Sequence, residues 1–331
     1  MIKVDIISGF LGAGKTTLIK HLLAHVYGNE NVVLIENEFG EIGIDGGFLK
    51  EAGIEIREMN SGCICCSLVG DFASSLKEVV DTYHPDRIII EPSGVGKLSD
   101  VTRAVNDVAE SLELEISHKV VVADVTKCKM YLKNFGEFYK NQIENANTII
   151  LSRTDIAKEG KAEEALELLK KINSAAAIVT TPVDKLDDET LIKALENSSS
   201  AMDLLAEVEG EHEHDHEHHH EHGDSCCHHD HGHEHHHHHA DEIFTSWGTE
   251  TTKAYTKAQL NELLSSFEGE AKGTILRSKG IVKDAESDEF IYFDYVPGQI
   301  DIRSGSPDYI GKVCVIAAGY TEDELKDIFT R

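Results

Sequence analysis

The chain opens on the stretch that decides its architecture, Ile2-Lys3-Val4-Asp5-Ile6-Ile7-Ser8-Gly9-Phe10-Leu11-Gly12-Ala13-Gly14-Lys15-Thr16. Residues 2–7 are a short apolar run, which is typical of a buried strand. Residues 9–16 then fill every fixed position of the phosphate-binding loop G-x-x-x-x-G-K-[ST], and residues 17–26 predict a helix. This succession predicts an α/β P-loop domain with a mostly parallel sheet. The alternative is a glycine-rich turn that binds no ligand.

Each residue type in this loop has a role in holding phosphate. Gly9, Gly12 and Gly14 let consecutive backbone N–H groups, with that of Ala13, turn inward around a β-phosphate. The helix N-terminus, which includes Thr17, adds N–H donors and the positive end of its dipole. We expect Lys15 to reach the β- and γ-phosphates and to act in catalysis, and the Thr16 hydroxyl to bind Mg²⁺.

The length and composition of the chain limit its possible domain organisation and partners. With 331 residues the chain is long enough for two domains, which we place at 1–185 and 240–331, with a helical connector at 186–210 and a histidine-rich tract at 211–239. Its 60 acidic against 31 basic residues give a formal charge of −29, which argues against nucleic acid or an anionic membrane as a partner. We find no secretory signal and no run of 18 apolar residues, and we expect a cytoplasmic protein.

Acidic residues follow the predicted second strand, residues 32–35. The sequence there is Glu36-Asn37-Glu38-Phe39-Gly40-Glu41. In a P-loop domain, the loop after this strand lies near the γ-phosphate and Mg²⁺. The carboxylates are therefore candidates for binding a cation, and the alternative is an ordinary solvated loop.

Three thiols lie within four residues, at Cys63, Cys65 and Cys66. They come after a predicted strand, 54–58, and before a predicted amphipathic helix, 68–83. A helix N-terminus lowers the pKa of a thiol and favours the thiolate, which binds soft cations. Thiolates with carboxylate or imidazole in tetrahedral geometry suit Zn²⁺, with Co²⁺ or Ni²⁺ as substitutes. Buried structural thiols and a redox pair are the alternatives.

The next predicted strand, residues 87–90, ends in Glu91-Pro92-Ser93-Gly94. A carboxylate at the end of a buried strand is what a second Mg²⁺-organising element requires. Glu91 is therefore a candidate Mg²⁺ ligand, and the backbone of Gly94 is a candidate contact of the γ-phosphate. We expect both to take part in catalysis.

Together, the lysine loop, the segment from Glu36 to Glu41, Gly62-Cys63-Ile64-Cys65-Cys66 and Glu91-Pro92-Ser93-Gly94 resemble the CobW-type P-loop GTPases. That family is associated with metal delivery and is similar to the GTPases that insert nickel into urease and hydrogenase. The resemblance covers the first 185 residues well and the last 90 more loosely. It implies a metal site of Cys65, Cys66 and Glu36 beside the nucleotide, with Cys63 and Glu41 as further ligands.

The same resemblance implies a guanine-reading motif at Ser152-Arg153-Thr154-Asp155, after a predicted strand at residues 148–151. The Asp155 carboxylate can accept both N1–H and the exocyclic amine of guanine, donors that adenine does not present together. Arg153 replaces the family's usual lysine, and its aliphatic stem can lie over the purine plane. The remaining elements predicted for this domain are a strand at 120–123, a helical segment after it, a helix at 158–172 and a strand at 177–180.

Residues 211–239 follow a predicted helical stretch, 188–208, and have an unusual composition. The 29 residues hold 16 of the chain's 20 histidines, eight acidic residues, Cys226 and Cys227. Such a segment buries no core, so we expect disorder in the absence of metal. Imidazoles at this density, from His212 to His239, predict a loose multi-site store for Zn²⁺, Ni²⁺ or Co²⁺. An expression tag and a solvated linker are the alternatives.

From Ala240 the composition returns to that of a folded domain. Capping-box patterns at Thr256 and Thr321 predict the starts of two helices. Apolar runs at 273–282, 290–296, 300–303 and 313–318 predict strands. We therefore expect a smaller α+β domain with an antiparallel sheet. It resembles the CobW C-terminal domain, and we find no catalytic constellation in it.

These features predict a GTP-dependent metal carrier. The first domain would bind GTP·Mg²⁺ and hydrolyse it slowly, and the adjacent cysteine site would deliver Zn²⁺, Co²⁺ or Ni²⁺ to a client metalloprotein or a metal-cofactor pathway. We expect no nucleic-acid or membrane partner, and a homodimer is the assembly considered. One alternative is a metal buffer in which the histidine-rich tract carries the function and GTPase activity is vestigial. Another, a kinase or ATPase with incidental cysteines, is disfavoured by Asp155 and by the Glu91-x-x-Gly94 spacing.

Overall fold

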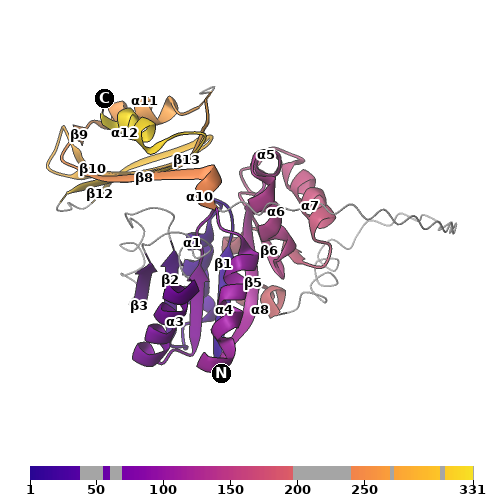
Figure 1. Ribbon diagram of the computed structural model, residues 1–331. Coiled ribbons are helices and arrows are strands. Elements are labelled where there is room, and N and C mark those ends of the chain that lie inside the picture. Colours follow the sequence, from indigo (N-terminus) through magenta and orange to yellow (C-terminus); the bar gives the residue numbers. More distant parts are fainter. Residues whose placement is uncertain (38–54, 60–68, 197–239, 269–271, 306–309, 331) are drawn as a thin grey trace, which may run out of the picture.

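The computed structural model describes residues 1–331 except 38–54, 60–68, 197–239, 269–271, 306–309 and 331. The described residues form two sheets, each with its own helices (Figure 1). Within these residues, no helix has the length and apolar character needed to span a membrane.

The first domain is built on a seven-stranded sheet with the order β3-β2-β4-β1-β5-β6-β7. All of its described pairings are parallel, which agrees with the predicted P-loop fold. The carboxyl ends of the strands therefore share one edge, which is where α/β sheets bind ligands. The strands are β1 (Ile2–Ser8), β2 (Val32–Asn37), β3 (Glu55–Met59), β4 (Arg87–Glu91), β5 (Leu114–Asp124), β6 (Thr148–Ser152) and β7 (Ala177–Val179).

Helices cover both faces of this sheet because its central strands are apolar on both sides. One face is packed by α3 (Val69–Tyr83), α4 (Leu98–Leu112), α5 (Cys128–Asn134), α6 (Gly136–Glu144) and α7 (Lys161–Ile172). The other is packed by α1 (Lys15–His21), the π-helical turn η1 (Leu22–Val26), the short η3 (Val183–Lys185) and α8 (Asp188–Glu196).

The segment that we assign to the connector begins with a helix that packs on the first sheet. In α8, Leu191 is fully buried in the same core cluster as Ile7 and Leu18. The Thr148 hydroxyl at the start of β6 donates a hydrogen bond to the Ala194 carbonyl at 2.9 Å. The described part of this segment is therefore integral to the first domain.

A buried polar cluster holds the middle of the first sheet, and we call its residues, Asp5, Tyr27, Glu30, Arg87 and His118, the Asp5 cluster. The Asp5 carboxylate accepts hydrogen bonds from Arg87 at 2.7 Å and Tyr27 at 2.8 Å, and lies 2.7 Å from His118 Nδ1. Arg87 also donates to Glu30 at 2.6 Å and stacks on the Tyr27 ring. Burial opposes ionisation of Asp5, but the His118, Arg87 and Tyr27 contacts outweigh it and lower the pKa of Asp5.

The second domain is a six-stranded sheet with two helices on its outer face (Figure 1). The main path is β12-β11-β10-β13-β8, with antiparallel pairings throughout, and β9 adds a short parallel pairing to β10. This agrees with the predicted α+β domain. Its elements are α10 (Ala240–Ile243), β8 (Phe244–Thr251), β9 (Ala254–Tyr255), α11 (Lys257–Ser265), β10 (Thr274–Asp284), β11 (Phe290–Val296), β12 (Gln299–Gly305), β13 (Gly311–Ala318) and α12 (Glu322–Thr330).

The predicted capping box at Thr256 is confirmed, and one of the two hydrogen bonds of the pattern predicted at Thr321 is present. Thr256 and Gln259 form a reciprocal capping box at the start of α11. At the start of α12 the Glu324 carboxylate accepts a hydrogen bond from the Thr321 N–H at 3.0 Å. These contacts satisfy helix N–H groups that otherwise have no partner.

The two domains share one aromatic cluster. Phe244, at the start of β8, is 2% exposed, and its ring lies 5.1 Å from Phe138 and 5.6 Å from Phe135. Phe10, a residue of the phosphate-binding loop, is packed into the same cluster, 4.3 Å from Tyr131. A side chain of the second domain therefore helps to hold the loop of the first.

Candidate functional site

The phosphate-binding loop has the backbone conformation that its glycines predict. Gly9, Gly12 and Gly14 have φ values of 144°, 68° and 105°, which side-chain-bearing residues rarely adopt. A Cβ at Gly9 would lie 2.4 Å from the Val122 carbonyl oxygen, so the loop rests directly on β5. Ala13 is buried beneath it, and Gly14 immediately precedes α1.

Lys15 is held at the centre of the loop. Its side chain is 5% exposed, and its Nζ donates to the Gly9 carbonyl at 3.1 Å and lies 3.7 Å from Glu91 Oε1. Glu91 ends β4, so the predicted catalytic lysine and the predicted Mg²⁺ ligand lie side by side. Gly94 approaches the loop as well, since a Cβ there would lie 3.0 Å from the Leu11 nitrogen.

Glu36 and Glu91 are in register on neighbouring parallel strands, β2 and β4. Both strands end at the same edge, and Glu36 is 5% exposed. Neighbouring strands are about 4.8 Å apart. The candidate ligand of the transported metal and the candidate ligand of Mg²⁺ are thus adjacent across the sheet.

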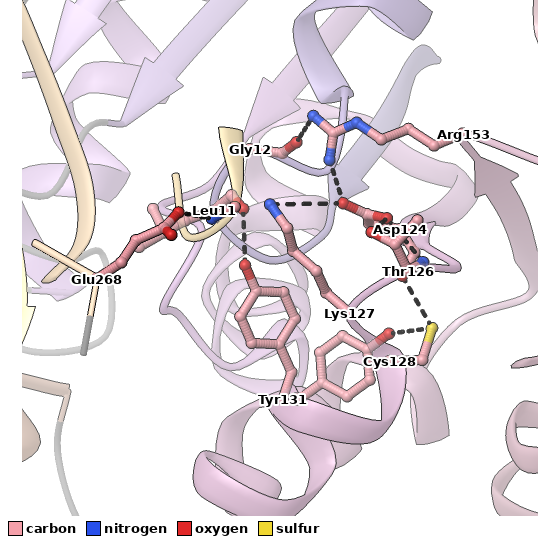
Figure 2. Close-up of polar contacts among 11 residues, drawn as sticks. Leu11, Gly12, Asp124, Thr126, Lys127, Cys128, Tyr131, Arg153 and Glu268 are labelled. Carbon is pink, nitrogen blue, oxygen red and sulfur yellow. Dashed lines mark hydrogen bonds and ion pairs between the residues drawn. The ribbon is translucent and has the colours of Figure 1, made fainter. Parts of the chain in front are cut away.

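A second polar cluster lies where β5 and β6 end, and Figure 2 shows it. We call Asp124, Thr126, Lys127 and Arg153 the Asp124 cluster. The Asp124 carboxylate pairs with the Arg153 guanidinium, accepts from the Thr126 hydroxyl at 2.6 Å and lies 3.7 Å from Lys127 Nζ. Burial, opposed by the Asp124 charge, lowers the pKa of Lys127 to about 8.

Arg153 joins this cluster to the phosphate-binding loop. Its second guanidinium nitrogen donates to the Gly12 carbonyl at 3.0 Å (Figure 2). The guanidinium therefore links the end of β5 to the loop, while the residue itself has a positive φ of 61°. These contacts hold the Arg153 head group at the loop, and the stacking of its aliphatic stem on a purine stays a prediction.

The rest of the predicted guanine motif lies at the end of β6 and just beyond it. The Ser152 and Thr154 hydroxyl oxygens are buried and have no hydrogen-bond partner among the described residues. Asp155 is exposed. Buried hydroxyls without partners are costly, which is consistent with a polar ligand binding there.

A cavity of about 320 Å³ lies over the loop. The predicted residues that line it are Gly12, Gly14, Lys15, Thr16, Thr17, Glu91 and Arg153. Gly9, Ala13, Gly94, Ser152 and Asp155 are not among its lining residues. A nucleotide phosphate chain fits the donor set of this cavity, since backbone N–H groups, a lysine and a hydroxyl converge on it.

The predicted metal site is described in part. Glu36 is placed at the end of β2, whereas Cys63, Cys65, Cys66 and Glu41 lie outside the described residues. So does the whole histidine-rich tract, including Cys226 and Cys227. In the described part of the chain, no three His, Cys, Asp or Glu side chains gather as a metal site.

No sequence pattern used above indicated Asp124, Lys127 or Lys20, and Lys20 also lines the cavity. Asp124 carries the same signal as Glu91, an acidic residue that directly follows an apolar strand. That signal could have found it. Lys20 is exposed and Lys127 is buried, but neither has a comparable signal, because lysines are common in helices and turns of any sequence.

Comparison with known proteins agrees with this geometry. Residues 3–180 match the family described as "CobW/HypB/UreG, nucleotide-binding domain". Residues 244–331 match the family described as "Cobalamin synthesis protein cobW C-terminal domain". The zinc chaperone YjiA of Escherichia coli is 30% identical over 207 residues, 56% of this chain and 59% of the relative. The zinc-regulated GTPase metalloprotein activator 1 of Schizosaccharomyces pombe is 28% identical over 204 residues, 59% of this chain and 49% of the relative.

These curated relatives are matched over about half of their length. Among solved structures, Zn(II)-bound YjiA GTPase from E. coli superposes with a TM-score of 0.44 at 21% identity, covering 99% of this chain and 98% of the other. The two domain matches follow the two sheets described above, and the first includes the loop, Glu36, Glu91 and Arg153. The chain therefore belongs to the CobW/HypB/UreG family of nucleotide-binding proteins and carries a CobW C-terminal domain.

Proposed function

We propose that this protein is a GTP-hydrolysing metal carrier that works in the cytoplasm. Its first domain binds GTP with Mg²⁺ and hydrolyses the γ-phosphate. Cys65, Cys66 and Glu36, with Cys63 and Glu41, hold Zn²⁺ as cargo, and Co²⁺ or Ni²⁺ are tolerated by the same donors. Hydrolysis releases the metal to a client metalloprotein. Relatives named as zinc chaperones and as a GTPase metalloprotein activator support this proposal.

The observation that supports the proposal most directly is the pairing of Glu36 on β2 with Glu91 on β4. Glu36 is the proposed metal ligand that lies within the described residues, and Glu91 lies 3.7 Å from Lys15, the lysine proposed to face the phosphates. A displacement of either strand end moves the other, because the two strands are hydrogen-bonded neighbours. Metal affinity and nucleotide state are therefore coupled, with reciprocal effects that are typically about 1–3 kcal/mol.

The residues around the loop have separate tasks in hydrolysis. Lys15 neutralises the β- and γ-phosphates, and the loop N–H groups hold the phosphate chain. Thr16 and Glu91, which both line the cavity, would hold Mg²⁺. When bound, Mg²⁺ supplies charge that offsets the negative charge developing on the phosphate oxygens. Gly94 contacts the terminal phosphate through its backbone.

Base selection is assigned to the end of β6. Asp155 accepts the two adjacent guanine donors, and the buried Ser152 hydroxyl, without a partner among the described residues, supplies a further polar contact. Arg153 supports the phosphate-binding loop by donating a hydrogen bond to the Gly12 carbonyl. Guanine recognition thus depends on Asp155 more than on the residue that replaces the family's lysine.

The decisive experiment measures coupling. In protein lacking residues 211–239, Zn²⁺ affinity is titrated against a chelating dye in the GTPγS-bound and GDP-bound forms. We expect the two affinities to differ by about fivefold or more. Replacing both Cys65 and Cys66 by Ser should remove tight Zn²⁺ binding and leave GTPγS binding intact, since a hydroxyl is a poor ligand for a soft cation. Cys314→Ser, in the second domain, is the matched control and should change neither.

Equal Zn²⁺ affinities in the two nucleotide forms would contradict the carrier. They would favour the second candidate, a metal buffer, which the density of histidines in residues 211–239 supports. Deleting that tract separates the two functions. A carrier keeps Zn²⁺-responsive GTP turnover, whereas a buffer loses most of its bound metal.

A further inference from the structure

The second sheet presents one face to the phosphate-binding loop. On β11, Ile291, Phe293 and Tyr295 pack into the core beneath α11 and α12. Side chains alternate along a strand, so Asp294 and Val296 belong to the opposite face, and both line the cavity over the loop. In Figure 1, α11 and α12 lie on the side of the second sheet that faces away from the first domain.

Contact between this face and the loop is close. A Cβ at Gly12 would lie 2.5 Å from Val296 Cγ1. A glycine at this position therefore serves both the turn of the loop and the approach of the second domain. The sheet of the second domain is a wall of the cavity and not a distant neighbour.

The wall carries charged side chains in register across three strands. Lys279 on β10 pairs with Asp294 on β11, which pairs with Asp301 on β12. Asp294 also lies 3.4 Å from the Arg277 guanidinium and 4.0 Å from Lys279 Nζ. The Arg277 and Lys279 side chains are 17% and 9% exposed, so both are largely shielded from solvent.

The charge of the cavity is opposite to that of the whole chain. The lining residues include six lysines and arginines against three acidic residues, whereas the chain carries a formal charge of −29. Three of the six cations come from the second domain, namely Arg277, Lys279 and Arg303. A positive, partly enclosed cavity in an acidic protein attracts anions, and a nucleotide's phosphate chain is the anion that the loop is built to hold.

We propose that Arg277 and Lys279 of the second domain contact the phosphate groups of the nucleotide bound at the loop. The inference rests on the proposed binding of GTP. Asp294 holds the two cations in place through its ion pairs, and it also competes with phosphate for them. Nucleotide binding therefore draws the two domains together, and loss of the terminal phosphate weakens that attraction.

The test uses the full chain and equilibrium titration with GTPγS. The double variant Arg277→Gln with Lys279→Gln should lower affinity about tenfold or more, because two charge-assisted contacts are lost. Lys283→Gln is the control: it removes one positive charge from the same strand at an exposed position away from this cavity, and affinity should stay within about twofold.

Asp294→Asn should change the affinity for GTPγS in the opposite direction. Without the competing carboxylate, affinity for GTPγS should rise, about threefold, and a folding defect would not produce that result. If the double variant binds as well as Lys283→Gln and Asp294→Asn does not bind more tightly, the inference is overturned. Wild-type protein that binds no GTPγS would instead contradict the proposed function itself.

Discussion

Asp5 on β1 and Asp124 on β5 are buried aspartates on neighbouring strands, and each forms an ion pair with an arginine. They are 1% and 3% exposed. Asp5 lies in the middle of its strand, and its partners come from β4, β5 and the turn after η1. Asp124 is the last residue of its strand, and its arginine reaches onward to the Gly12 carbonyl.

The difference indicates that position along the strand distinguishes a cluster whose partners all lie within the fold from one that contacts the phosphate-binding loop. Ligands of a parallel α/β sheet bind beyond the carboxyl ends of the strands. A buried ion pair in mid-strand is thus satisfied within the fold and remote from ligand. The same chemistry at a strand end is one contact away from the phosphate-binding loop. Two substitutions and one change of pH test this difference between the two clusters, from the largest expected effect to the smallest.

The largest effect is expected from Arg87→Met in the Asp5 cluster. It removes the guanidinium that pairs with the buried Asp5 and the partly buried Glu30, leaves Asp5 only Tyr27 and His118 as partners, and should cost about 3–5 kcal/mol of unfolding free energy. Urea denaturation measures this. Arg103→Met, which removes an exposed pair on α4, is the control and should cost less than about 1 kcal/mol. GTPγS affinity of folded Arg87→Met protein should be unchanged, and a loss there would break the comparison.

A smaller loss of stability and a larger loss of binding are expected from Arg153→Met. The substitution removes contacts to Asp124 and to Gly12, and Lys127 and Thr126 still face the carboxylate. We expect about 1–2 kcal/mol of unfolding free energy and about a fivefold to tenfold loss of GTPγS affinity, measured by urea denaturation and by titration. Affinity equal to wild type would remove Arg153 from the nucleotide site.

The smallest effect is expected on the contribution of Asp5 to the free energy of unfolding when the pH changes from 7 to 5. Because the pKa of Asp5 is lowered in the folded protein and is about 3.9 in the unfolded chain, Asp5 is ionised in both states above pH 5. Its contribution to stability is therefore complete there, and is lost as the pH falls below about 4 and through the folded pKa. The difference in unfolding free energy between wild type and Asp5→Asn should be constant from pH 7 to 5 and narrow below pH 4. A difference that narrows already at pH 6 would assign the effect to another group.

Much of the first domain was predictable because its strands are continuous apolar runs. Residues 87–90 and 148–151 were predicted within one residue of β4 and β6. The start of β5 was missed, since residues 114–119 pair with β1 alone and carry polar residues such as Glu115 and Lys119. The helix α4 was not predicted either. One-sided pairing gives the start of β5 a mixed pattern that resembles a loop, whereas the buried residues of α4, Leu98, Val101, Ala104 and Val105, recur at helical spacing and could have indicated that helix.

Edge strands and contacts between domains were the harder parts. β8 was missed because it is rich in Thr, Ser and Gly, and its partner β13 lies some 60 residues further along the chain. The loop motif indicated Lys15 and Thr16, and the acidic residue at the end of a buried strand indicated Glu91; all three line one cavity. The Arg153 contact to Gly12 and the approach of Val296 depend on how separate elements dock, and no local pattern encodes that docking.

Phe244 fills a place in the first domain's aromatic cluster, and this has a consequence during synthesis. Chains leave the ribosome N-terminus first, and domains fold as units in that order. Residues 1–196 are therefore complete while the ring that closes their core is still about 50 residues from being made. In that interval the nascent domain exposes an apolar socket next to its phosphate-binding loop. A chaperone can shield it, or the Phe244 of another copy can enter it, which makes domain swapping the expected misassembly of this chain.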